Sequence, residues 1–132
     1  MTNSCICGSN KVFEKCCAPF LNGSGWAKTP EQLMRSRYSA YALGGYGDYL
    51  LQTWFPATAK GLTPEALSQH SCDWIELQIL QKSQKGDQGM VEFNAWFHND
   101  KGDKEVLHEK SVFQRLDGIW LYVGGEVKSN PG

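Results

Sequence analysis

Apolar side chains repeat at two different periods along this chain. In the first half, Met34, Tyr38 and Tyr41 recur at offsets of four and seven, which places them on one stripe of an α-helix. Thr29-Pro30 supplies an N-cap hydroxyl and a proline for the first helical position, and Gly44-Gly45 is a usual helix end. The pattern therefore predicts a helix between these two signals.

Two shorter helices are predicted after it. One covers about residues 48–54 and stops before Pro56, because the residue ahead of a proline is disfavoured in the helical conformation. Thr63-Pro64-Glu65 repeats the start signal of the first helix and predicts a third one, which extends to about His70.

From residue 73 onward, apolar and polar side chains alternate, which is the period of a strand with one buried face. Strands are predicted around residues 75–79 and 91–97, and over residues 105–116 and 119–123. The segments between them are typical of hairpin turns and contain Lys85-Gly86-Asp87, residues 99–103 and Asp117-Gly118. Helices followed by an antiparallel meander predict an α+β domain, with the helices packed on one face of a curved antiparallel sheet.

The composition excludes several classes of function. The 132 residues carry 13 basic and 14 acidic side chains, a formal net charge of -1, whereas proteins that bind bulk DNA or RNA usually present a cationic face. No apolar run approaches the roughly 18 residues of a membrane span, and the first residues lack the charge and the apolar stretch of a secretory signal. We therefore expect a cytoplasmic protein that neither enters a membrane nor binds nucleic acid directly.

Four of the five cysteines lie close together, as Cys5, Cys7, Cys16 and Cys17. Four soft sulfur ligands match the tetrahedral coordination of Zn²⁺. Reducing conditions favour metal over disulfides, a disulfide between the adjacent Cys16 and Cys17 would be strained, and the spacing fits none of the common ferredoxin patterns. Because four sulfur ligands leave no position for a catalytic water, we expect a structural zinc ion.

Residues 1–25 contain few apolar side chains and cannot fold by burial alone. Metal binding could supply the missing free energy, about 10–16 kcal/mol in small zinc peptides. Gly8 and Asn10 tolerate the left-handed backbone of tight turns, and Asn22-Gly23-Ser24-Gly25 is typical of a flexible linker. We expect residues 1–25 to form a zinc module with its linker and residues 26–132 to form the α+β domain.

The cysteine run resembles the SEC-C motif, a small zinc module that also occurs at the C-terminus of the SecA translocation ATPase. The chain keeps the four sulfur ligands together with Gly8, Ser9 and Lys11 of that motif. Val12 and Glu14 stand where the motif usually has lysine, which reduces the basic surface available to an acidic partner.

Most of the remaining chain resembles the YchJ-like family of bacterial proteins. The runs that carry the resemblance are L-M-R-S-R-Y-S-A-Y at residues 33–41, D-Y-L at 48–50 with T-W at 53–54, H-E-K-S-V-F at 108–113, and G-I-W at 118–120. The resemblance implies a nuclear transport factor 2-like (NTF2-like) fold, in which a bent antiparallel sheet wraps a cone of helices. Longer members carry a second SEC-C motif after this domain, and the sequence reaches Pro131-Gly132 without one, so we expect any function that needs two metal modules to be absent or altered.

Cones of this kind often enclose a pocket, and some proteins of the fold are isomerases or dehydratases. If the hairpin turns tightly at residues 100–103, Asn94 lies opposite Glu109 and Trp96 opposite Leu107. The expected lining is Tyr38, Glu92, Asn94, Trp96, Glu109 and Arg115. Glu109 is a candidate general base. We favour a structural role in which it pairs with an arginine, because the sequence enforces no acid–base pair.

Arg35 and Arg37 point about 200° apart on a helix, so they cannot hold one ligand together. We expect one of them to face solvent and the other to reach over the Tyr38–Tyr41 stripe to a sheet carboxylate such as Glu109.

Three functional hypotheses follow. The leading one is a zinc-binding protein that docks on a protein or ribosomal partner through residues 5–17 and is not an enzyme. The second is a small-molecule-binding protein, or an isomerase-like or dehydratase-like enzyme, that uses a pocket in the cone. The third is RNA binding through the zinc module. The sequence names no partner, no substrate and no oligomeric state.

Overall fold

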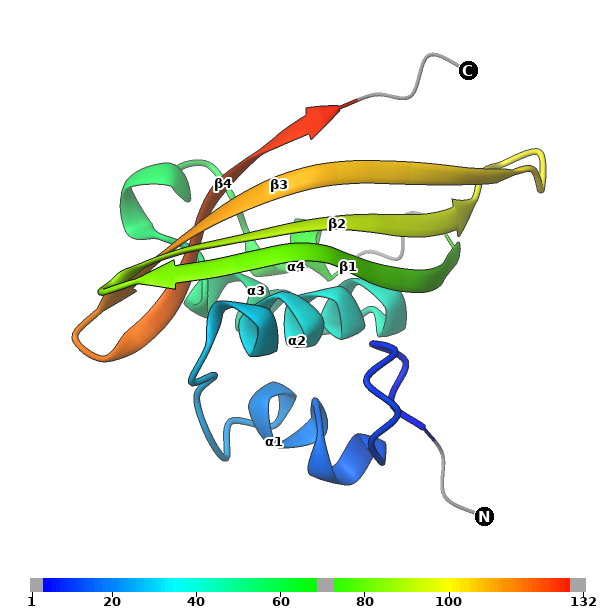
Figure 1. The fold of residues 1–132 in the computed structure, drawn as a ribbon. Helices are drawn as coiled ribbons and strands as arrows, with labels where there is room; N and C mark the ends of the chain where they lie inside the picture. The colour runs from blue at the N-terminus through cyan, green and yellow to red at the C-terminus, as the bar shows by residue number, and fades with distance from the viewer. Residues whose placement is uncertain (1–3, 69–72, 129–132) are drawn as a thin grey trace.

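The computed structural model describes residues 4–68 and 73–128. Helices come first and a four-stranded antiparallel sheet follows (Figure 1), which confirms the α+β class. The helical elements are η1 (Phe13–Lys15), α1 (Ala18–Leu21), α2 (Pro30–Leu43), α3 (Gly47–Gln52), η2 (Pro56–Thr58) and α4 (Pro64–Leu67). The strands are β1 (Asp73–Lys85), β2 (Gln88–His98), β3 (Lys104–Leu116) and β4 (Ile119–Lys128), which pair in the order β1-β2-β3-β4.

Helix α2 has the ends that the sequence predicts. The side chain of Thr29 accepts a hydrogen bond from the backbone N–H of Gln32 at 3.1 Å, Pro30 occupies the first turn, and Gly44 ends the helix with a φ of 75°. Helix α4 likewise begins after Thr63, which accepts from the N–H of Ala66. The predicted continuation to His70 lies outside the described residues.

Helix α3 ends earlier than predicted because the chain leaves it to pair with the sheet. The N–H of Tyr122 in β4 donates to the carbonyl of Thr53 at 2.8 Å, and the N–H of Phe55 donates to the carbonyl of Tyr122 at 2.8 Å. Extended backbone at Trp54 is needed for this pairing, and it ends the helix at Gln52. The contact fixes the end of α3 over the strand that carries Tyr122.

The predicted pairing of β2 with β3 is wrong by one residue. Asn94 lies opposite His108, and Glu109 lies opposite Phe93. The loop explains the difference, because the N–H of Asn99 donates to the carbonyl of Asp103 at 2.9 Å and Gly102 takes a left-handed φ of 83°. This is a three-residue loop with glycine at its left-handed position, whereas the prediction assumed a two-residue loop.

The core lies between the concave face of the sheet and α2, and the segment that contains α1 lies on the other side of that helix (Figure 1). The largest fully buried side chains from the sheet are Trp120 and Phe113, and those from the helices are Leu33 and Leu50. Three of the four clustered cysteines belong to the same buried cluster. No helix in the described part of the chain is long and apolar enough to cross a bilayer.

Candidate functional site

The four sulfur atoms of the cysteine cluster converge on one point. The Sγ atoms of Cys5, Cys7, Cys16 and Cys17 all lie within 4.8 Å of one another. Cys7 and Cys16 are 3.6 Å apart, and Cys16 and Cys17 are 4.0 Å apart. Three of the four are buried and Cys16 is half-buried. The cluster is thus arranged as the ligand set of one metal ion.

Two left-handed residues shape the turn between the first pair of cysteines and the second. Gly8 has a φ of 83° and Asn10 a φ of 68°, as the sequence predicts. The N–H of Cys5 donates to the carbonyl of Lys11 at 2.7 Å and closes the turn. The hydroxyl of Ser9 lies 3.1 Å from the Cys16 sulfur, so the turn also supplies a polar group to the cluster.

The cluster favours thiolate at one sulfur before any metal binds. A hydrogen bond from Cys17 lowers the pKa of Cys7 to about 4, against burial, which raises it. The same contact and burial raise the pKa of Cys17 well above its ordinary value. A metal ion would displace the remaining protons, because it stabilises each thiolate directly.

Helix α2 holds the cysteine module against the domain. The Nη1 of Arg35 donates to the carbonyl of Cys7 at 2.7 Å, and its Nε pairs with Glu31 at 2.9 Å. The Cys5 sulfur contacts the hydroxyl of the buried Ser39 at 3.9 Å. The segment predicted to be a flexible linker forms a turn in which Asn22 accepts from the N–H and the hydroxyl of Ser24. The module is therefore packed onto the domain.

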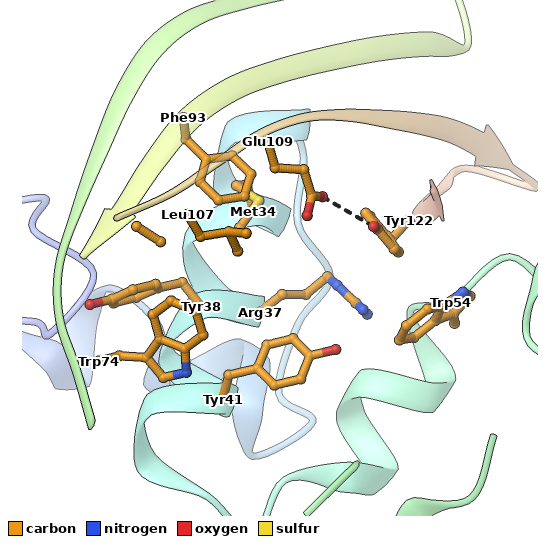
Figure 2. Close-up of a pocket in the computed structure, with 11 residues that line it drawn as sticks. Met34, Arg37, Tyr38, Tyr41, Trp54, Trp74, Phe93, Leu107, Glu109 and Tyr122 are labelled. Atoms are coloured by element: carbon orange, nitrogen blue, oxygen red, sulfur yellow. Dashed lines mark hydrogen bonds between the residues drawn. The ribbon is translucent and has the colours of Figure 1, made fainter. Parts of the chain in front are cut away.

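A cavity of about 230 Å³ lies between α2 and the concave face of the sheet (Figure 2). Its polar residues gather at one end and its apolar residues at the other. The lining consists of Met34, Arg37, Tyr38, Tyr41, Trp54, Trp74, Phe93, Ala95, Leu107, Glu109 and Tyr122.

Arg37 is the cation of the polar end, and only 3% of its surface is exposed. Its Nη1 donates to the carbonyl of Leu50 and to the hydroxyl of Thr53, both at 2.8 Å. The guanidinium carbon lies 4.7 Å from the ring centroids of both Trp54 and Tyr122. Burial lowers the pKa of Arg37, but an arginine keeps its charge at neutral pH in any protein environment.

Glu109 is the anion of the same end. Its Oε2 accepts hydrogen bonds from the hydroxyl of Ser111 and from the hydroxyl of Tyr122, the latter at 3.1 Å. Burial, and then the neighbouring Glu109 carboxylate, raise the pKa of Tyr122, so this hydroxyl keeps its proton for that bond. The space beside the carboxylate exists because residue 125 is glycine, since a Cβ there would overlap Glu109.

The apolar end is aromatic. Tyr38 and Trp74 meet edge to face with ring centroids 6.1 Å apart, and Trp74 and Phe97 lie 5.2 Å apart. Trp74 reaches this face through a bulge: β1 shifts register between Trp74 and Glu76, so Trp74 shares the inner face with Leu77. Simple alternation would have placed Trp74 on the outer face.

The structure brings only part of the predicted pocket together. Tyr38 and Glu109 line the cavity. Glu92, Asn94 and Trp96 do not, because the one-residue change of register turns them to the outer face, where Glu92 contacts His108 at 2.7 Å. Arg115 pairs instead with Asp87 at 2.8 Å near the hairpin turn.

The two arginines also differ from prediction. Neither is a solvent-facing residue, because Arg35 contacts the cysteine module and Arg37 lies in the cavity wall. Within the described residues, no carboxylate lies at ion-pair distance from Arg37, although the charge of Glu109 acts on it through the cavity. The Glu109–arginine pair proposed from the sequence does not form, and Glu109 bonds to two hydroxyls instead.

Sequence reasoning missed Trp54 and Tyr122 as cavity residues. The two residues meet because an isolated parallel β-bridge pairs Trp54 with Tyr122 of β4, and no local sequence pattern predicts such a long-range contact. Tyr41 and Met34 could have been assigned, since both belong to the helical stripe that Tyr38 defines.

Comparison with known proteins agrees with this architecture. The SEC-C motif matches residues 1–19, and the domain described as "YchJ, middle NTF2-like domain" matches residues 29–125. UPF0225 protein VP1145 from Vibrio parahaemolyticus is 40% identical over 129 residues, which cover 95% of this chain and 75% of that protein.

Two solved structures are similar. One is the solution structure of RPA3114, a SEC-C motif containing protein from Rhodopseudomonas palustris, which is 37% identical in sequence and has a TM-score of 0.87. The match covers 96% of this chain and 100% of RPA3114. The other is a putative calcium/calmodulin-dependent protein kinase type II association domain from Thiobacillus denitrificans, which is 12% identical with a TM-score of 0.62. The match covers 80% of this chain and 98% of that domain, and at this identity it shows a shared fold alone. The chain belongs to the UPF0225 family, in which a SEC-C motif precedes a YchJ-type NTF2-like domain.

Proposed function

We propose that the four cysteines hold one structural Zn²⁺. A tetrahedral ion with Zn–S bonds of about 2.3 Å requires sulfur atoms about 3.8 Å apart. The Cys7–Cys16 and Cys16–Cys17 sulfur separations of 3.6 and 4.0 Å come close to this value, and all four sulfur atoms lie within 4.8 Å of one another. The ion would have no open position for substrate, so its role is to order residues 4–21 against α2.

We infer that the function lies in the cavity, which binds a small organic molecule. The observation that supports this is Arg37, a charged side chain 3% exposed whose guanidinium forms part of a cavity wall. An apolar cavity with a few convergent polar groups is the usual form of a ligand site. Packing alone would not require a buried charge beside about 230 Å³ of free space.

Binding fits the cavity better than catalysis. Glu109 is the single carboxylate among the described residues that line the cavity, and its Oε2 is already held by two hydroxyl donors. General acid–base catalysis also needs an acid that returns the proton, and burial raises the pKa of the lining Tyr41 and Tyr122, which makes them poor acids. The arrangement instead fixes the carboxylate in place, as a recognition site requires.

Aromatic probes test this proposal. Zinc-loaded protein is titrated with indole, 2-naphthol and phenylacetamide, and backbone amide shifts are followed by NMR. We expect shifts concentrated at Trp74, Phe93 and Tyr122. A Leu107→Trp variant fills the cavity from one wall and should abolish them. The proposal fails if none of the probes shifts these residues, or if the shifts survive in the filled variant.

A second candidate function is docking of an acidic protein segment on the cysteine module. The exposed Lys11 and Lys15 flank a groove beside Cys16, and Phe20 and Gln32 lie in its wall. Because the module is packed on α2, this groove would present its cations in a fixed position. A ribosomal partner would meet the same surface through acidic protein or through RNA.

The docking candidate is tested with two labelled probes, a ten-residue glutamate peptide and a ten-nucleotide uridine RNA. We expect the peptide to bind and the double variant Lys11→Glu, Lys15→Glu to lose it. Lys101→Glu, a matched exposed lysine in the β2–β3 loop, should retain it. Peptide binding that is equal in all three proteins would refute docking at the module, and binding of RNA alone would favour the RNA alternative.

A further inference from the structure

We infer that the cavity recognises an uncharged ligand that carries a carboxamide, or an amide group of similar shape, on an aromatic body. This inference rests on the proposed ligand-binding function of the cavity and names the class of molecule that the site accepts.

The first argument is the charge of the polar end. Among the described residues of the lining, Arg37 and Glu109 are the two that carry a formal charge, and their charges sum to zero. A ligand with a net charge would leave one unit of charge uncompensated in a largely apolar enclosure, which is costly. A neutral head group with a strong dipole, whose oxygen faces Arg37 and whose N–H faces Glu109, leaves no such excess.

The second argument is the hydrogen-bonding capacity that remains. The Nη1 of Arg37 is occupied by Leu50 and Thr53, and the guanidinium also has a side-chain hydrogen bond with the hydroxyl of Tyr41. The five N–H donors of an arginine exceed these three acceptors, so the group can still donate to a ligand. On Glu109, both hydroxyl donors bond to Oε2, which leaves Oε1 as an acceptor. A ligand with a hydrogen-bond acceptor next to a donor could therefore bond to Arg37 and to Oε1 of Glu109 at once. A primary amide has both, because its oxygen and its NH₂ group are attached to the same carbon.

Tyr41 adds a third polar group at this end. Its hydroxyl points toward the guanidinium (Figure 2), and burial raises its pKa while Arg37 lowers it. The Tyr41 oxygen accepts from Arg37 and the hydroxyl keeps its own proton, which it can donate to the same ligand oxygen as Arg37. A carbonyl oxygen has two lone pairs and can accept both bonds.

Other head groups fit less well. A carboxylate would be attracted by Arg37 but repelled by the fixed charge of Glu109, and an ammonium group would experience the reverse. An amino-acid head group is neutral overall, but its ammonium carries three donors, and among the described lining residues Oε1 of Glu109 is the one carboxylate oxygen without a hydroxyl donor. The unsatisfied donors would retain their desolvation cost.

The apolar end of the cavity indicates what the rest of the ligand is. Tyr38, Trp74 and Phe93 present ring faces and edges, and Met34 and Leu107 complete the wall (Figure 2). At about 30 Å³ per liquid water, the cavity volume of about 230 Å³ equals about eight waters. One aromatic ring with a short amide head would fill this volume, and its ring would stack against the existing rings.

A matched ligand series tests the inference. Phenylacetamide, phenylacetate, phenethylamine and L-phenylalanine share one ring and differ in the head group. Dissociation constants are measured by calorimetry on zinc-loaded protein at neutral pH. We expect phenylacetamide to bind about tenfold or more tightly than each of the other three.

Variants then identify the groups responsible. Glu109→Gln keeps the shape of the side chain and removes its charge, so phenylacetamide should lose affinity and phenylacetate should gain it, each by about tenfold. Glu92→Gln is the matched control, because this glutamate lies on the outer face of β2, and both affinities should stay unchanged. If Glu109→Gln lowers the melting temperature strongly, Ser111→Ala, which removes one donor to Glu109, gives a second measurement.

The outcomes separate the two proposals. Tighter binding of phenylacetate, phenethylamine or L-phenylalanine than of phenylacetamide would overturn the amide inference and leave the ligand-binding function standing. The amide inference would also be overturned if Glu109→Gln left the preference for phenylacetamide over phenylacetate unchanged. If no compound of either series binds, the ligand-binding function itself fails.

Discussion

Arg35 and Arg37 stand two residues apart on α2 and serve opposite sides of it. Arg35 donates to the carbonyl of Cys7 at 2.7 Å in the cysteine module, whereas Arg37 forms the charged end of the cavity under the sheet. The 3.6-residue period of the helix makes this division unavoidable, because side chains two positions apart point about 200° from one another. Helix α2 is thus the element through which the module supports the cavity.

This arrangement predicts that Arg35→Gln weakens the whole domain. The variant loses a charge-assisted hydrogen bond to Cys7 and a pair with Glu31, and the free energy of unfolding should fall by about 1.5–3 kcal/mol. Urea denaturation of zinc-loaded protein measures it. Arg115→Gln breaks a more exposed pair with Asp87, and should cost at most about 1 kcal/mol. Equal losses in the two variants would contradict a supporting role for Arg35.

Substitution by alanine should have different effects on stability at the adjacent Gly124 and Gly125 of β4. A Cβ at Gly125 would overlap the Glu109 carboxylate, whereas a Cβ at Gly124 meets nothing within 4 Å. Gly125→Ala should therefore cost about 1–3 kcal/mol and move Glu109, while Gly124→Ala should be neutral or slightly stabilising. Thermal unfolding of the two variants provides the comparison. A neutral Gly125→Ala would mean that Glu109 moves freely, which would remove the basis for a fixed recognition group.

The proposed zinc site predicts that substitution of one of its four cysteines removes the ion completely. Cys7→Ser deletes a buried ligand with a low pKa, and the zinc content measured by mass spectrometry should fall from one per chain to near zero. Amide exchange in residues 4–21 should then accelerate, because burial alone does not order this segment. Cys72→Ser, which changes none of the four proposed ligands, should retain the ion. Full zinc content in Cys7→Ser would exclude a four-cysteine site.

Local signals were sufficient for most of the elements and for the turn that gathers the four cysteines, but not for the cavity. The caps of α2 and the left-handed turns at Gly8 and Asn10 depend on neighbours in sequence, and the structure has them as predicted. The face of each sheet residue depends on register, where an error of one residue exchanges inside and outside. A three-residue loop closed by Asn99 and Asp103 made that difference, and it moved Glu92, Asn94 and Trp96 out of the site.

The polar end of the cavity was beyond sequence reasoning for a different reason. Arg37 is held by Leu50 and Thr53 from α3 and its end, and by the rings of Trp54 and Tyr122. These contacts require the chain after α3 to pair with β4, and no sequence pattern predicts a pairing between segments so far apart in the chain. The helical period correctly separated Arg35 from Arg37, but it carried no information on what each would meet.

Buried tyrosines predict a loss of stability at alkaline pH. Burial raises the pKa of Tyr49 from its ordinary 10 to about 12, against a hydrogen bond with Ser36 that lowers it. Below pH 10 both the folded and the unfolded chain keep the proton, so stability is unaffected. Between pH 10 and about 12 the unfolded chain ionises first, and the free energy of unfolding should fall by about 2–3 kcal/mol from this residue.

Tyr49→Phe should remove this part of the pH dependence, because phenylalanine has no proton to lose. Urea denaturation at pH 8 and at pH 11 gives the slope for each protein. Ser36→Ala removes the hydrogen bond of 2.6 Å to the Tyr49 hydroxyl and leaves the tyrosine buried, so its pH dependence should be at least as steep as in the unchanged protein. A Tyr49→Phe variant with an unchanged slope would show that the hydroxyl ionises without opening the fold, and that the contact between α2 and α3 admits water.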